Sequence, residues 1–345
     1  MTVVPGSKAT ARVEEVPDVD QRDEVLLVRG LSIGVCGTDR EITDGAYGTP
    51  PPGHTRLIVG HEGLGEVLYA PEGSGFSAGD LVVGIVRRPD PLPCPACGAG
   101  EWDMCRNDLF AERGIVRMDG YGSERWQLEP AFAVRIPPRL GGLGVLLEPA
   151  SVLAKAWDQV DQISRRAFFL RGRALVTGAG PIGLMACLLG VQRGYEMHVV
   201  DLALSGPKPE LVAELGATYH AGDAAEIGVD VDVVIECTGL GVVGRSAARR
   251  LVSGGIMCLT GITNLDPTFD VDATTLNRNM VLHNQVLFGT VNAGRRHWDQ
   301  AAAALDAADP GWLSALITRR VPVTRWTEAL ERQPDDIKVV VDLST

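Results

Sequence analysis

The distribution of apolar residues divides the chain near residue 150. Before that point, short β-branched runs at 24–36, 57–70 and 80–86 alternate with glycine and proline. Short apolar runs bounded by turn residues are typical of strands in a small, irregular β domain. A last apolar run at 337–343 predicts a strand that returns to this domain.

After Pro149 the pattern changes to alternating helices and strands. Apolar residues at helical spacing predict helices over 150–163, 181–194 and 209–216. Continuous apolar runs of the kind found in parallel sheets predict strands at 173–178, 196–201, 231–239, 255–261 and 286–292. We therefore expect an α/β fold with a β-rich domain at 1–150, completed by about 293–345, and a doubly wound parallel-sheet domain at 151–292.

A glycine-rich turn joins the first strand of the second domain to its helix. Its sequence, GAGPIG at 178–183, has the GxGxxG spacing and the strand–turn–helix context of a dinucleotide fingerprint. The first glycine permits the tight turn, the second lets backbone amides approach the pyrophosphate, and the third permits close helix–strand packing. We expect the cofactor to be bound by Gly178, Gly180, Pro181, Ile182, Gly183, Thr238 and Gly239.

Asp201 bears on which dinucleotide is bound. It ends the second strand of that domain, about twenty residues after the glycine turn, where a carboxylate accepts hydrogen bonds from ribose hydroxyls and repels a 2′-phosphate. The segment after it, LALSGPKP, has Lys208 as its one cation and contains no arginine. We therefore expect NAD, with NADP as the disfavoured alternative. A surface or helix-capping carboxylate is the other interpretation of Asp201.

Cys36 and His61 indicate a metal site. Cys36 closes an apolar run in VCGTD, and His61 follows another in GHE. Zinc accepts thiolate sulfur and imidazole nitrogen, and a catalytic site has three protein ligands and one open position. Glu62 and Glu148 are the candidate carboxylate ligands. A lone cysteine or histidine is more often structural, but the joint pattern is far more specific than either residue.

Three further cysteines stand close together in the sequence. Cys94, Cys97 and Cys105 lie in CPACGAGEWDMC, which is typical of a structural zinc loop. A closed zinc site needs four ligands, and Asp90 is a candidate for the fourth, through oxygen. The alternative is three free thiols in a surface loop.

Composition narrows the function classes. The net charge of −12 argues against nucleic acid or an anionic membrane as the main partner. The sequence has no apolar run of the roughly eighteen residues that a membrane span needs, and its first residues lack the apolar core of a secretory signal. Seven cysteines, several of them inside apolar runs, fit reduced thiols and metal ligands. We expect a cytoplasmic protein.

Taken together, these motifs resemble one family over essentially the whole chain. The sequence resembles the zinc-containing medium-chain alcohol dehydrogenases, most closely the archaeal and bacterial glucose dehydrogenases. The similar segments are VCGTDREI at 35–42, IVGHEGLGEV at 58–67, NDLFAERGI at 107–115, MDGYGSE at 118–124, LLEPASVLAKA at 146–156, TGAGPIG at 177–183 and the segment 269–292. The resemblance implies a GroES-like catalytic domain and a Rossmann domain.

The resemblance also assigns roles to individual residues. It implies zinc ligands at Cys36, His61 and Glu148, with Glu62 as an alternative ligand. The residues it implies for the substrate side are Thr38, which relays the substrate proton, Glu112, which holds sugar hydroxyls, and Asn292, which approaches nicotinamide or substrate. Two features depart from the family: the structural-zinc loop is one cysteine short, and the double arginine that some sugar dehydrogenases carry for NADP is absent.

These observations predict zinc-dependent oxidation of a sugar hydroxyl, with transfer of a hydride to the nicotinamide. For glucose, the hydride leaves C1 and the product is an aldonolactone. The alternatives are a dehydrogenase for another polyol, an amino sugar or a biosynthetic alcohol, a metal-free reductase, and a non-catalytic nucleotide-binding regulator. We expect a homo-oligomer, either a dimer or a tetramer.

Overall fold

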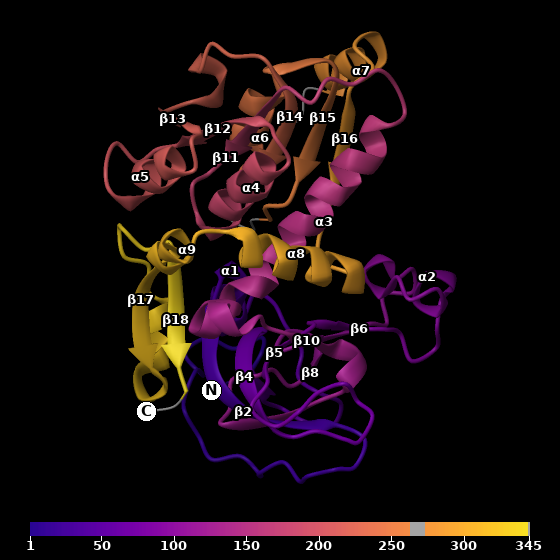
Figure 1. Ribbon diagram of the computed structural model, residues 1–345, viewed down its shortest axis with the longest axis vertical. Coiled ribbons are helices and arrows are strands. Elements are labelled where there is room, and N and C mark those ends of the chain that lie inside the picture. Colours follow the sequence, from indigo (N-terminus) through magenta and orange to yellow (C-terminus); the bar gives the residue numbers. More distant parts are fainter. Residues whose placement is uncertain (263–272, 344–345) are drawn as a thin grey trace. The chain divides into compact units, whose positions relative to one another are not determined.

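The chain folds into two compact units in a computed structural model that describes residues 1–262 and 273–343 (Figure 1). One unit comprises Met1–Ser151 and Asn292–Thr345, and the other Val152–Val291. Residues 269–272 of the family-like segment lie outside the described residues. None of the described helices is long and apolar enough to cross a membrane.

The first unit is built on a seven-stranded sheet. Its strands run in the order β10 (Ala133–Arg135), β5 (Leu81–Gly84), β4 (Glu62–Tyr69), β2 (Leu26–Val35), β18 (Lys338–Asp342) and β17 (Ile317–Pro322), and β9 (Arg125–Leu128) also pairs with β2. The apolar run near the C-terminus thus forms β18, which is antiparallel to β2. Leu26, Val28, Ile33, Leu64 and Val83 are fully buried in this sheet.

Short elements surround that sheet. Two small sheets contain β1 (Thr2–Val3) with β3 (Leu57–Ile58), and β6 (Arg87–Arg88) with β7 (Ala111–Arg113) and β8 (Arg117–Met118). The helices are α1 (Gly37–Thr43), α2 (Pro95–Gly98), α8 (Arg295–Ala307) and α9 (Pro310–Leu316), and the 3₁₀ segments are η1 (Trp102–Met104), η2 (Pro130–Phe132), η3 (Pro138–Leu146) and η5 (Val323–Leu330).

One expected strand of this unit is broken, and the break is informative. The run 57–70 forms β3 and β4 with a gap between them, because Gly60 has a φ of +91°. A side chain at Gly60 would lie 2.9 Å from the Ile33 side chain, so both the backbone conformation and the space require glycine. His61 occupies this gap, immediately before β4.

The second unit is a doubly wound parallel sheet, which confirms the expected α/β class. Its order is β13 (Thr218–Ala221), β12 (Glu196–Asp201), β11 (Arg173–Thr177), β14 (Val231–Glu236), β15 (Leu251–Leu259) and β16 (Val286–Gly289). The other elements are α3 (Leu147–Ser164), α4 (Pro181–Gln192), α5 (Pro207–Glu214), η4 (Ala224–Glu226), α6 (Gly241–Ala248) and α7 (Ala273–Leu282). The strand order reverses between β11 and β14, where such folds bind dinucleotides.

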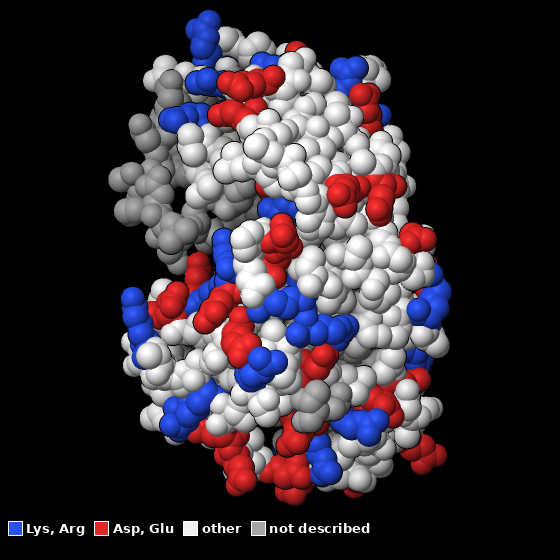
Figure 2. Space-filling view, turned by 90° about the vertical axis from the view of Figure 1, so that its left-hand side faces the viewer, with Lys and Arg blue, Asp and Glu red and all other residues white. Residues whose placement is uncertain are grey.

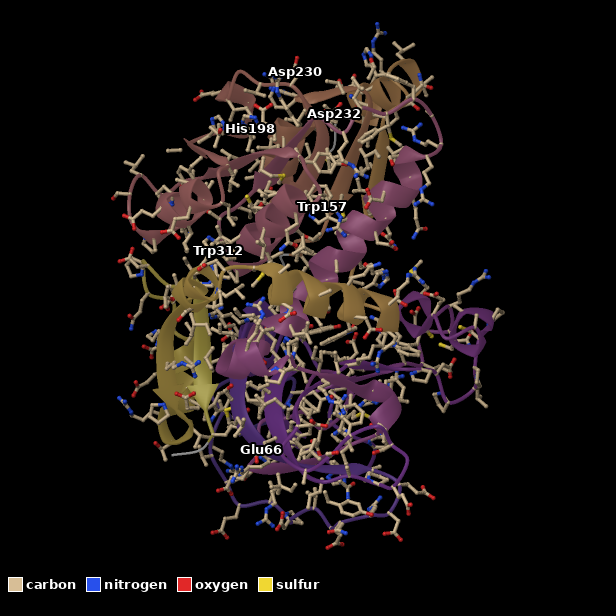
Figure 3. All side chains as sticks on the ribbon, in the orientation of Figure 1. Glu66, Trp157, His198, Asp230, Asp232 and Trp312 are labelled. Atoms are coloured by element: carbon tan, nitrogen blue, oxygen red, sulfur yellow. The ribbon has the colours of Figure 1, made fainter. Side chains whose placement is uncertain are left out.

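Buried apolar side chains hold the second unit together. Leu175, Val200, Val234 and Met257 belong to one buried cluster. Trp157, labelled in Figure 3, is fully buried and donates a hydrogen bond to the Ala186 carbonyl at 3.0 Å.

On the molecular surface, basic and acidic side chains are interspersed over the face shown in Figure 2.

Candidate active site

Cys36 and His61 lie in contact in the first unit. Cys36 follows β2 and caps α1, where its Sγ accepts a hydrogen bond from the Thr38 amide at 3.3 Å. The Sγ lies 3.1 Å from Nε2 of His61, which the break between β3 and β4 brings to the same point. The two residues that the sequence predicts as metal ligands are therefore adjacent.

Asp39 supports both of these residues, although the sequence analysis did not single it out. One carboxylate oxygen lies 3.4 Å from Nδ1 of His61, and the other accepts the Cys36 amide at 3.0 Å. A carboxylate behind a histidine fixes the ring and leaves the opposite nitrogen for a metal. The signal was present in CGTD, because an acidic residue three positions after a helix cap closes a capping box.

The surroundings of His61 favour a positive charge. Burial alone would lower the pKa of His61, but the Asp39 carboxylate and the Cys36 sulfur outweigh it and raise that pKa well above its usual value. The Asp39 carboxylate and the Cys36 sulfur, which stabilise a proton on the ring, would also stabilise a metal cation bound at Nε2. The donor set of sulfur, imidazole and carboxylate therefore fits zinc.

Two carboxylates complete the cluster. Potential ligand atoms of His61, Glu62 and Glu148 lie within 4.8 Å of one another, and those of Cys36, Asp39 and His61 form a second, overlapping group. Burial and the neighbouring Glu62 raise the pKa of Glu148 to about 7. His61 belongs to both groups and so connects the other three expected ligands, Cys36, Glu62 and Glu148.

Lys338 distinguishes the two glutamates. It is fully buried on β18, forms an ion pair with Oε2 of Glu62, and donates to the Val35 carbonyl at 3.2 Å. Gly34 makes room for the pair, since a side chain there would overlap the Glu62 carboxylate. The negative charge of Glu62 is therefore already balanced by the protein.

Glu112 lies in a second buried cluster of the same unit. Its Oε1 accepts hydrogen bonds from Nε and the terminal nitrogen of Arg87, at 3.0 and 2.9 Å, and from the Asn292 amide. Arg87 is itself buried and stacks on Phe110. The structure thus brings Glu112 and Asn292 together and adds Arg87, which the sequence analysis missed. Thr38 is half-buried on α1, two residues from Cys36.

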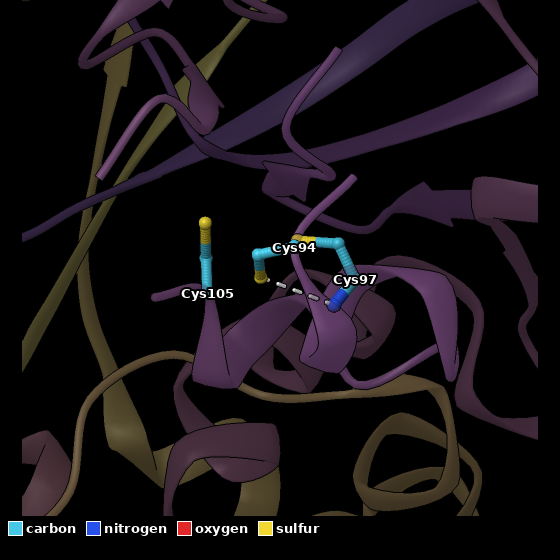
Figure 4. Close-up of side chains that lie close together, drawn as sticks. All are labelled: Cys94, Cys97 and Cys105. Carbon is cyan, nitrogen blue, oxygen red and sulfur yellow. Dashed lines mark hydrogen bonds between the residues drawn. The ribbon is translucent and has the colours of Figure 1, made fainter. Parts of the chain in front are cut away.

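The three loop cysteines also converge (Figure 4). Potential ligand atoms of Cys94, Cys97 and Cys105 lie within 4.8 Å of one another. Sγ of Cys94 accepts the amides of Cys97 and Arg106, and these hydrogen bonds lower the pKa of Cys94 to about 7. Asp90 is not part of this cluster. Its buried carboxylate accepts the Leu92 amide and the Asn107 side chain, at 2.8 and 2.7 Å.

The glycine turn of the second unit has the geometry of a dinucleotide site. Gly178 has a φ of +84°, and a side chain at Gly183 would lie 1.8 Å from the Gly178 carbonyl. Gly180 caps α4, which begins with Pro181 and Ile182. A side chain at Gly180 would meet no atom of the described residues within 4 Å, which leaves room for a ligand at this helix terminus.

Asp201 faces this turn from the end of β12. Its carboxylate accepts the Ala179 amide at 2.7 Å and the Ala203 amide at 3.1 Å, and Lys208 lies 3.3 Å away. Burial alone would raise the pKa of Asp201, but these neighbours together lower it below its usual value. The carboxylate is therefore ionised at neutral pH, as a ribose-binding residue must be.

The comparisons with known proteins cover the whole chain. Residues 21–138 match the alcohol dehydrogenase GroES-like domain, and residues 141–343 match the C-terminal domain of glucose dehydrogenases. Glucose 1-dehydrogenase of Methanocella arvoryzae is 36% identical over 99% of this chain and 98% of the relative. That of Thermoproteus tenax is 36% identical over 100% and 99%.

Solved structures agree with these relatives. Haloferax mediterranei glucose dehydrogenase, in complex with NADP, zinc and gluconolactone, has a TM-score of 0.89 and 31% sequence identity. The match covers 100% of this chain and 99% of that one.

Proposed function

The chain belongs to the glucose dehydrogenase family of zinc-dependent dehydrogenases, and we propose that it oxidises an aldose at C1 to the aldonolactone with NAD as the preferred hydride acceptor. The observation that carries this proposal is the Cys36–His61 contact, backed by Asp39 and flanked by two buried glutamates. A metal-free reductase has no use for such a donor set.

We propose that Cys36, His61 and Glu148 hold the zinc. Lys338 supports this choice, because its ammonium group forms an ion pair with Glu62. Burial and the Glu62 charge instead raise the pKa of Glu148, so a metal cation would stabilise the ionised Glu148 carboxylate. Bound zinc acts as a Lewis acid that lowers the pKa of the substrate hydroxyl.

The chain's own residues handle the proton and the sugar. Thr38 lies on α1, two residues after the N-cap Cys36, and we propose that its hydroxyl accepts the substrate proton and passes it on. Arg87 and Asn292 both donate to Oε1 of Glu112, and we propose that Oε2 accepts a hydrogen bond from a sugar hydroxyl. Because Arg87 also neutralises Glu112, the site suits an uncharged polyhydroxylated substrate.

Asp201 supports NAD over NADP. Its carboxylate would accept the two ribose hydroxyls and repel a 2′-phosphate, and Lys208 offsets only part of that repulsion. We expect Asp201→Ser to raise KM for NAD and to lower KM for NADP, each by roughly tenfold. Equal KM values for the two cofactors in the wild type would contradict this preference.

We also propose a second zinc at Cys94, Cys97 and Cys105. The three convergent thiols and the amide hydrogen bonds to Cys94 support a thiolate metal site. Asp90 would have to give up a hydrogen bond to Leu92 or Asn107 to become the fourth ligand.

The remaining expectations concern assembly and location. We infer a dimer or tetramer, because β16 is the edge strand of the second unit's sheet among the described residues and carries partly exposed apolar residues. The seven free thiols support a reducing, cytoplasmic location.

The test of the activity is a survey of aldoses and polyols, with NAD and NADP reduction followed by absorbance. We expect glucose or a close aldose to be oxidised, and Cys36→Ser and His61→Ala to abolish turnover while NAD still binds. Oxidation of simple polyols without any aldose would favour the alternative of a polyol dehydrogenase.

A further inference from the structure

A buried carboxylate lies at the point where the strand order of the second unit reverses. Glu236 ends β14 and is 2% exposed. Thr177 ends the neighbouring β11, and its hydroxyl donates to Oε1 of Glu236 at 3.1 Å. This hydrogen bond spans the two strands between which a doubly wound sheet opens its dinucleotide crevice.

The same carboxylate binds the turn that follows β14. Oε1 accepts hydrogen bonds from both the amide, at 2.8 Å, and the hydroxyl of Thr238, and Oε2 accepts the Gly239 amide at 3.0 Å. With Thr177, four donors converge on one buried anion. Hydrogen bonds to an ionised acceptor are the strong ones, so the position of this turn is well determined.

The turn is packed against the glycine fingerprint. A side chain at Gly178 would lie 3.0 Å from Cγ2 of Thr238, so Thr238 borders the first glycine of the fingerprint. On the other side, the Thr260 amide donates to the Glu236 carbonyl at 2.9 Å. Glu236 thereby connects the ends of β11, β14 and β15 around Gly178.

These contacts change the expected role of the turn. The amides of Thr238 and Gly239 already donate to Glu236. The turn can therefore border the cofactor through packing contacts, but these two amides are not available to hydrogen-bond to it. We propose that Glu236 is a positioning residue for the cofactor, which holds residues 238–239 against Gly178 and so sets the width of the dinucleotide crevice. This inference rests on the proposed nicotinamide-linked function.

Glu236→Gln tests this role on the zinc-loaded enzyme. The glutamine has the same shape, but its amide nitrogen must face either the Gly239 amide or the three donors of Thr177 and Thr238, so at least one donor loses its acceptor. We expect Kd for NADH, measured by fluorescence titration, to rise roughly 5- to 100-fold. The zinc content and kcat at saturating cofactor should change little, because Glu236 would contact neither metal nor sugar.

The matched control is Asp232→Asn. Asp232 is a carboxylate at the opposite end of the same strand, where it accepts the Arg173 amide at 2.8 Å (Figure 3). It should leave Kd for NADH unchanged. A residue that merely supports the fold would instead lower Tm without raising Kd in the folded protein.

The proposal is overturned if Glu236→Gln binds NADH within about twofold of the wild type. Should Glu236→Gln fail to fold, Thr177→Val removes one donor and leaves the carboxylate in place. We then expect Kd to rise about threefold or more, and an unchanged Kd overturns the proposal equally. Wild-type protein that binds neither NADH nor NADPH would overturn the proposed function, and this inference with it.

Discussion

Asp39 acts at the scale of single residues, because it binds two candidate zinc ligands at once. Its two oxygens contact the His61 ring and the Cys36 amide from the buried side of α1. Burial alone would raise the pKa of Asp39, but the His61 charge and the Cys36 amide lower it below its usual value. Asp39 therefore remains an anion that stabilises positive charge at His61.

Asp39→Asn should weaken zinc binding. The loss of this charge and of the ring's fixed orientation should lower zinc affinity about 10- to 100-fold, measured by competition with a chromophoric chelator. Asp44→Asn is the control, because Asp44 is an exposed carboxylate at the other end of the same helix. Equal zinc affinities in the two variants would show that Asp39 has no such role.

Glu148 should make zinc binding depend on pH. Its pKa in the metal-free protein is about 7, so below that pH a proton competes with zinc for the carboxylate. Zinc affinity should therefore fall as pH decreases from 8 to 6, by up to about tenfold per unit from this group.

Protonation of His61 adds to the pH dependence in every variant, since its pKa is also raised. The informative comparison is with Glu148→Gln, which should show the shallower slope. Identical slopes in the two proteins would mean that Glu148 does not bind the metal.

At the scale of elements, the cysteine loop formed by α2 and η1 leads to a prediction about the number of zinc ions per subunit. With both zinc sites filled, metal analysis should give two zincs per subunit in the wild type and one each in Cys97→Ser and Cys36→Ser. Loss of the loop metal should also lower Tm by roughly 4–8 °C, corresponding to about 2 kcal/mol. One zinc in the wild type and in Cys97→Ser alike would leave the loop as free thiols.

The elements also explain what the sequence predicted well. The parallel strands were recognisable because each is a continuous apolar run. β13 was missed because its residues, TYHA, are half-buried or exposed and carry no such signal. The break at Gly60 was hidden within an apolar run, although glycine at that position is required by its positive φ.

In the candidate site, too, some residues could be predicted from the sequence and others could not. Cys36, His61 and the glycine turn belong to short local motifs, so the sequence alone indicates their chemistry. Lys338 reaches the Val35 carbonyl across 303 residues of sequence, and Arg87 reaches Glu112 across 25. Such supporting contacts depend on strand pairing, and a lone lysine in the run 337–343 gives no indication of its partner.

At the scale of the whole molecule, the candidate metal and sugar site and the candidate cofactor site belong to different units. The first unit contains the donor set for zinc and the Glu112 cluster, and the second contains the glycine turn and Asp201. Metal and sugar binding should therefore respond to variants of the first unit, and cofactor binding to variants of the second.

The most direct test of the central claim is aldose oxidation before and after zinc removal. The enzyme should reduce NAD with glucose or a close aldose, lose that activity when a chelator removes its zinc, and regain it when zinc is restored. NADH binding, measured on the same metal-free sample, should persist. Full turnover by protein shown to contain no metal would contradict the zinc-dependent function assigned to Cys36, His61 and Glu148.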